Sequence, residues 1–199
     1  MSTRHAEVHR TTAETDVVVS MELDGSGTSH IDTGIGFFDH MLTLFAAHAR
    51  VDLTVTCHGD IEVDGHHTVE DIGISIGDAF RTAIGEKRGI SRYGTFFLPM
   101  DETLAMVSLD ISGRPFLCYD PGTEPMTPMI GTYDTELTEE FLRAFSFHAG
   151  ITLHVKILYG KNSHHRVEAV FKALAHALRI AIEKDARAGD EIPSTKGLL

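Results

Sequence analysis

The feature that most constrains the fold is an internal repeat that spans most of the 199 residues. The segment "FAAHARVDLTV" at residues 45–55 aligns with "FSFHAGITLHV" at residues 145–155, an offset of 100 residues. Farther along, "GHHTVEDIGISIGDAF" at residues 65–80 aligns with "SHHRVEAVFKALAHAL" at residues 163–178, an offset of 98 residues. Order and spacing are both kept, so the sequence predicts two tandem copies of one unit with a boundary near Gly94.

Hydrophobic periodicity indicates that each copy mixes strands and helices. The segments "TDVVVSMELDG", "VDLTVTC", "LAMVSLDI" and "RPFLCYD" are interpreted as strands, mainly from their alternation. Residues 37–49 have helical spacing, and both segments that begin with the His-His pair carry an apolar stripe at helical spacing. We therefore predict an α+β fold with repeats at residues 1–93 and 94–199, each a sheet with helices on one face, together forming one compact subunit.

Composition and charge narrow the class of function. The formal net charge of −12 excludes broad nucleic-acid binding, because phosphate contacts need clustered Lys and Arg. An anionic ligand would need a local basic cluster. The two cysteines, Cys57 and Cys118, lie far apart, which predicts free thiols in a reducing compartment. The first residues have no apolar signal core and no stretch is long enough to span a membrane, so we expect a cytoplasmic protein.

The repeated His-His-x-x-Glu pattern predicts metal binding. On a helix, residues four apart are neighbours, whereas adjacent residues point about 100° apart. His66 and Glu70 therefore share one ion while His67 faces elsewhere, and the second copy repeats this arrangement. A single His-His pair is usually a solvated surface feature, but two copies at matched offsets favour a metal site. Two such helices offer three ligands to each of two ions.

The repeat also indicates a fourth ligand for each ion. The offset of 100 residues places His40 opposite Glu140. The alternative for Glu140 is an acidic helix start, where a carboxylate is favoured by the helix dipole. Imidazole with some carboxylate suits Mn, Fe, Co, Ni or Zn. Pseudo-symmetry predicts one site of His40, His67, His164 and Glu168, and a second site of His66, Glu70, Glu140 and His165.

Several long motifs resemble one enzyme family over almost the whole chain. They are "TGIGFFDHML", "VDGHHTVEDIGISIGDAF", "GISRYG", "PMDETLA", "DISGRP", "HHRVEAVFKALAHAL" and "PSTKG", and they resemble imidazoleglycerol-phosphate dehydratase. The resemblance implies two tandem βαβ-type units like a domain of a ribosomal protein. It also implies a homo-oligomer of 24 subunits, two Mn²⁺ per active site at subunit interfaces, and a dehydration in histidine biosynthesis. Many members of that family have His at the position of Glu140.

The same resemblance implies the residues that act on the substrate. Glu14 would carry the proton, although without the resemblance it is an ordinary surface glutamate before a strand. Ser194 and Lys196 lie in a C-terminal tail, which either folds over the substrate phosphate or is a frayed end of the chain. The alternative for the polar face of the last helix, which carries Lys172, is an ordinary solvated stripe. The resemblance assigns phosphate binding to His48, Arg92, Arg114, Lys172, Ser194 and Lys196.

The implied reaction converts D-erythro-imidazoleglycerol phosphate to imidazoleacetol phosphate. The C–H bond that breaks is not acidic, so two ions would bind the ring nitrogens and favour an imidazolate that expels hydroxide. Loss of the neighbouring proton then gives an enol, which becomes the ketone. Two other classes of function remain. A dinuclear hydrolase usually needs bridging carboxylates, and a metal-storing shell would not require Arg92, Arg114 and Lys196.

Overall fold

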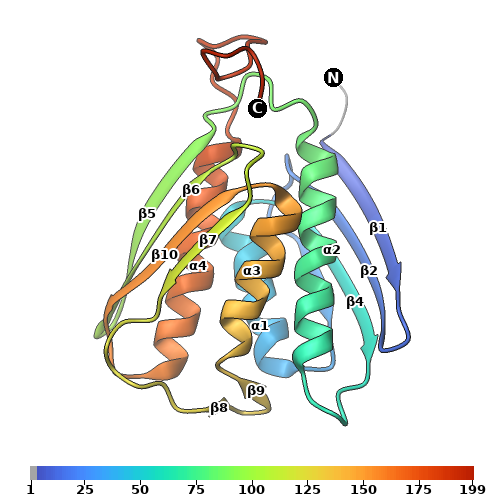
Figure 1. Cartoon of the computed structure of the whole chain (residues 1–199), viewed down its shortest axis with the longest axis vertical. Helices are drawn as coiled ribbons and strands as arrows, with labels where there is room; N and C mark the ends of the chain where they lie inside the picture. Colours follow the sequence, from blue (N-terminus) through green and yellow to red (C-terminus); the bar gives the residue numbers. More distant parts are fainter. Residues whose placement is uncertain (1–3) are drawn as a thin grey trace.

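The computed structural model describes residues 4–199 and consists of two four-stranded sheets with a layer of helices between them (Figure 1). The first unit contains β1 (His5–Thr11), β2 (Thr15–Glu22), β3 (Ser29–Asp32), α1 (Gly36–Ala49), β4 (Asp52–Gly59) and α2 (His66–Ile84). The second contains β5 (Tyr93–Met100), β6 (Thr103–Asp110), β7 (Phe116–Asp120), the short strands β8 (Met129–Ile130) and β9 (Tyr133–Asp134), α3 (Leu137–Ala149), β10 (Thr152–Tyr159) and α4 (Ser163–Ile182).

The two sheets have the same topology. Their strand orders are β1-β2-β4-β3 and β5-β6-β10-β7, which coincide once β5, β6, β7 and β10 are matched with β1, β2, β3 and β4. The pairs β3–β4 and β7–β10 are parallel, and the other pairs in these sheets are antiparallel. A helix joins the strands of each parallel pair, as parallel pairing requires. The predicted α+β fold with two βαβ-like units is therefore confirmed.

The apolar stripes read from the sequence form the inner faces of the elements. Val69, Ile72, Ile76 and Phe80 of α2 are completely buried. In β6, buried residues alternate with half-buried ones, so one face of the strand meets the helix layer. The corresponding stripe of α4 is buried along its whole length: Val167, Val170, Phe171, Leu174, Leu178 and Ile182.

The helix layer joins the two units. The helix α2 packs against α3 of the second unit, and α1 packs against α4. Gly73 and Gly77 of α2 allow a close approach, because a Cβ at Gly77 would lie 2.9 Å from the Phe145 carbonyl oxygen and 2.6 Å from the His148 Cβ. Buried apolar residues of both units form one continuous core. The units therefore share a core across the helix layer.

All four helices begin at the end of the molecule that carries β8 and β9, and the C-terminal segment lies at the opposite end (Figure 1). The histidines of both His-His pairs are the first residues of α2 and the second and third residues of α4. They therefore gather at one end of the fold. Within residues 4–199, none of the helices has the length and apolar character needed to cross a bilayer.

Candidate metal centre

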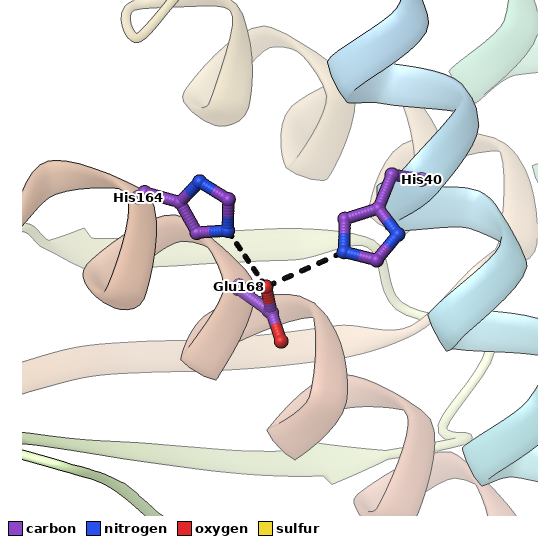
Figure 2. A group of neighbouring side chains, drawn as sticks. All are labelled: His40, His164 and Glu168. Carbon is purple, nitrogen blue, oxygen red and sulfur yellow. Dashed lines mark hydrogen bonds and ion pairs between the residues drawn. The ribbon is translucent and has the colours of Figure 1, made fainter.

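Three of the predicted ligands converge between α1 and α4. Figure 2 shows His40, His164 and Glu168, whose ligand atoms all lie within 4.8 Å of one another. The Nε2 atom of His164 lies 2.9 Å from Glu168 Oε2, and the Nε2 atom of His40 lies 3.5 Å from the same oxygen. His164 and Glu168 are four residues apart, so the helical repeat brings them onto one face as the sequence predicts.

Electrostatics keep the central carboxylate ionised. Glu168 is 5% exposed, and burial alone would raise its pKa. Its Oε1 atom lies 2.5 Å from Lys172 Nζ, and this contact together with the His164 bond lowers the pKa below its ordinary value. One anionic oxygen and two imidazole nitrogens are a donor set that a divalent transition metal prefers. The residues present therefore fit such an ion.

His67, the fourth ligand predicted for this site, does not belong to the group that the other three residues form. His67 places Nδ1 3.1 Å from an oxygen of Asp60, and its Nε2 lies 3.7 Å from Glu14. The bond to Asp60 raises the pKa of His67. His67 diverges from His66 because adjacent helix residues face different directions. Glu14 lies in the β1–β2 turn, half-exposed beside this ring, so the structure places the expected proton carrier next to a predicted ligand.

The second predicted set is spread over a wider area. His66 and Glu140 line one cavity of about 370 Å³, whereas Glu70 and His165 are not among its lining residues. Glu140 also lies 3.8 Å from Arg143 in its own helix. Within residues 4–199, the His40 group alone brings three potential ligand atoms together. A single chain therefore brings together three residues of the first set, while His66 and Glu140 of the second set line a common cavity.

His165 binds a carboxylate that the sequence analysis did not single out. Its Nδ1 lies 2.8 Å from Glu102 Oε2, and this bond raises the pKa of His165. The backbone N–H groups of Asn162 and Lys161 donate to Glu102 Oε1 at 2.8 and 3.1 Å. These bonds and the bond from His165 hold the Glu102 pKa far below its usual range. Asp60 binds His67 Nδ1 similarly, so each second histidine has its own carboxylate.

One signal in the sequence points to Glu102. It directly precedes Thr103, the first residue of β6, just as Glu14 directly precedes Thr15, the first residue of β2. Strands β6 and β2 are equivalent in the two units, so the repeat that matches the histidines also matches these two glutamates. Asp60 has no such signal, because its contact with His67 depends on the path of the turn between β4 and α2.

The predicted phosphate-binding arginines lie far from the metal ligands. Arg92 donates to Asp110 at 2.7 and 3.1 Å, and Arg114 Nη2 lies 3.9 Å from the same carboxylate. The Arg92 N–H donates to the carbonyl of Ala181, near the end of α4. Since α4 rises about 1.5 Å per residue, the 17 residues from His164 to Ala181 separate the two groups by about 25 Å.

The other predicted phosphate ligands lie in two places. Ser194 and Lys196 belong to the C-terminal segment, which Arg92 contacts through a 2.7 Å bond to the Pro193 carbonyl. Lys172 instead lies against Glu168 at the metal ligands. His48, in the last turn of α1, is 5.1 Å from His176 between ring centroids, and burial and Lys172 lower its pKa.

Comparisons with known proteins identify the family. The sequence profile described as imidazoleglycerol-phosphate dehydratase matches residues 33–178. A protein of that name from Cereibacter sphaeroides is 55% identical over 196 residues, covering 98% of this chain and 100% of the relative. One from Acetivibrio thermocellus is 56% identical over the same length, covering 98% of this chain and 99% of the relative.

Solved structures give the same result. The crystal structure of imidazoleglycerol-phosphate dehydratase from Staphylococcus aureus has a TM-score of 0.81 and 43% identity, covering 90% of this chain and 99% of that one. That of IGPD from Pyrococcus furiosus has a TM-score of 0.82 and 36% identity, covering 96% and 100%. The paired His-His-x-x-Glu helices, the fold and these similarities lead to one conclusion: the chain belongs to the imidazoleglycerol-phosphate dehydratase family and is a hydro-lyase.

Proposed function

We propose that this protein dehydrates D-erythro-imidazoleglycerol phosphate to imidazoleacetol phosphate in histidine biosynthesis. The observation that carries the proposal is the group of His40, His164 and Glu168, which lies within the matched part of the chain. The reaction removes hydroxide from the carbon beside the ring and a proton from the next carbon. The products are water and an enol, which becomes the ketone.

The proposed cofactor is a pair of Mn²⁺ ions for each subunit. His40, His164 and Glu168 would hold one ion with His67 as their fourth partner, and His66, Glu70, Glu140 and His165 would hold the other. Two such ions would supply Lewis-acid stabilisation of the imidazolate form of the substrate ring. Glutamate at position 140 keeps an anionic oxygen available to the second ion.

Glu14 is the residue proposed to carry the proton. Its carboxylate lies in the β1–β2 turn at the end of the fold where the helices begin, 3.7 Å from His67 Nε2. A carboxylate there would remove the proton from the carbon next to the leaving hydroxyl and return a proton as the enol becomes the ketone. Its side chain is half-exposed, so it is accessible to a substrate that enters from solvent or that a neighbouring chain holds.

We further propose that the complete site forms between chains. The predicted metal ligands lie at one end of α4, and the residues predicted to bind phosphate lie about 25 Å away at the other end. This second set comprises Arg92, Arg114, Ser194 and Lys196. A substrate with a three-carbon tail does not reach across this distance. One chain would supply the His40 group, with His48 and Lys172 near it, and a neighbouring chain would supply the residues at the other end of α4 that are proposed to bind phosphate. A closed symmetric homo-oligomer, with 24 subunits as the proposed form, meets this requirement.

The free thiols of Cys57 and Cys118 support the cytoplasm as the proposed location. The decisive experiment is an assay of the purified protein after metal removal and after reloading with Mn²⁺. We expect imidazoleacetol phosphate to form only in the reloaded sample, with no release of inorganic phosphate. Release of phosphate without the ketone would instead indicate a metal-dependent hydrolase. A loaded protein that produces neither product would contradict the proposal.

A further inference from the structure

The second histidine of each His-His pair, His67 in α2 and His165 in α4, has matching surroundings. In each ring, Nδ1 makes the shorter contact with a carboxylate: 3.1 Å for His67 with Asp60 and 2.8 Å for His165 with Glu102. In each ring, Nε2 lies farther from a second carboxylate, 3.7 Å from Glu14 or 3.8 Å from Asp101. The same arrangement therefore occurs twice, once in each unit.

The chemistry of imidazole gives this arrangement a meaning. A neutral ring has one protonated nitrogen and one nitrogen with a free lone pair, and only the latter binds a metal. A carboxylate is an acceptor only, so it holds the proton on the nitrogen that it contacts. Metal-binding histidines are commonly oriented in this way by a carboxylate on the other ring nitrogen.

We propose that Asp60 and Glu102 are positioning residues for metal binding, an inference that rests on the proposed function. Each holds its histidine with the proton on Nδ1 and so keeps Nε2 free for a divalent transition metal. Neither acid is itself a ligand in this assignment. The two are not equivalent in the repeat, since Asp60 precedes α2 and Glu102 precedes β6. The two units thus reach the same ring state with carboxylates from different turns.

The different surroundings of the two acids allow a sharp test. Besides His165, Glu102 accepts three donors on Oε1: the N–H groups of Lys161 and Asn162 and the Thr103 hydroxyl. In Glu102→Gln, these donors hold the amide oxygen, so the amide NH₂ faces His165 Nδ1. The NH₂ group is a donor and favours the ring with its proton on Nε2. The substitution therefore preserves the turn and reverses the tautomer.

Asp60→Asn is the matched contrast. Within the described residues, the side-chain oxygens of Asp60 contact only His67, at 3.1 and 3.2 Å. The amide of Asn at this position is free to turn its oxygen toward Nδ1, which keeps the original tautomer. Glu86→Gln, which removes a charge from the turn after α2, serves as the control for net charge.

Calorimetric titration of the metal-free proteins with Mn²⁺ measures the effect. We expect Glu102→Gln to lower the affinity of one site by about 10–100-fold, the range found for such outer partners. Asp60→Asn should lower the Mn²⁺ affinity by less than about tenfold, and Glu86→Gln should bind Mn²⁺ with wild-type affinity. Long-range ¹H–¹⁵N spectra at about pH 9, where imidazole is neutral, should show Nδ1–H for both rings in the wild type. In Glu102→Gln, His165 should show Nε2–H.

Three results would overturn the positioning role. They are wild-type affinity at both sites of Glu102→Gln, an Asp60→Asn loss as large as that of Glu102→Gln, and Nε2–H on either ring in the wild type. The last measurement decides the matter even if Glu102→Gln does not fold. A wild-type protein that binds no Mn²⁺ but shows Nδ1–H on both rings would contradict the proposed metal site itself, which separates the two failures.

Discussion

Asp52 organises a turn at the scale of a single residue. Its Oδ1 accepts the backbone N–H groups of Ser26, Gly27 and Thr28 at 2.8, 3.0 and 2.8 Å. These bonds from Ser26 and Thr28, above all, hold the Asp52 pKa below its ordinary value. The charged form is therefore favoured in the folded chain, and the turn before β3 depends on it.

Asp52→Ala should destabilise the metal-free protein by about 1–2 kcal/mol at pH 7, because three N–H groups lose a charged acceptor. The depressed pKa means that this contribution is present above the unfolded value and is lost as pH falls through the lower folded value. The difference between wild type and variant should therefore shrink below about pH 4. Urea unfolding with a chelator measures it, and Asp32→Ala is the control. A pH-independent difference would contradict this assignment.

Glu140 is the predicted ligand with the least local support. It shares a cavity with His66, and among the charged groups of residues 4–199 its one contact is with Arg143. Glu140→Ala should weaken one Mn²⁺ site and leave the other intact, since the two sets share no residue, and Glu140→His should be tolerated. If Glu140 merely favours the helix start, its loss costs about 0.3–1 kcal/mol of stability and no metal. Calorimetric titration decides, with Glu139→Ala on the same turn as control.

Glu14→Gln should abolish most turnover while metal binding and assembly persist. General acid–base groups typically contribute about 10²–10⁴-fold, and the amide cannot accept the proton. Steady-state rates on Mn²⁺-loaded protein, with metal content measured in the same sample, test this. Glu7→Gln, an exposed strand position in β1, controls for the loss of a charge nearby. A normal rate in the loaded variant would return Glu14 to the role of an ordinary surface residue.

Close packing of α2 on α3 determines what the elements tolerate. A Cβ at Gly77 would lie 2.9 Å from both the Ala149 nitrogen and the Phe145 carbonyl oxygen, and backbone atoms do not move aside cheaply. Gly77→Ala should therefore destabilise the protein by about 1–3 kcal/mol through overpacking, despite the higher helix propensity of Ala. Gly36→Ala in α1 meets no atom within 4 Å and should not destabilise. Thermal unfolding of both variants compares them; equal midpoints would contradict the close approach.

The whole molecule supplies a test of a site shared between chains. Glu14→Gln removes the proposed proton carrier and Lys196→Ala removes a residue proposed to bind phosphate, so each variant alone should be nearly inactive. If the two ends come from different chains, equal random co-assembly should restore about one quarter of the sites. Dissociation and reassembly of a mixture, followed by the rate assay, measures this. No recovery in mixed particles, shown to contain both variants, would place both ends of the site in one chain.

The sequence by itself determined the parts of this protein that depend on local periodicity. The repeat predicted two equivalent units, and strand alternation and helical stripes predicted their inner faces. The four-residue spacing of His164 and Glu168 predicted that they lie together on one helix face, and their side chains are in contact at 2.9 Å. Periodicity did not reveal the hairpin in which Met129 pairs with Asp134 and Ile130 with Tyr133, because its two strands are too short for a periodic signal.

Only the tertiary structure decided which distant residues meet. The exchange of helix partners, α1 with α4 and α2 with α3, places His40 beside His164 and leaves His67 with Asp60. It also sets Arg92 at the far end of α4 from the metal ligands. Periodicity reports which side of an element is apolar, because that depends on residues a few positions apart. It does not report the partner, because the packing of one apolar face against another depends on shape across the whole core.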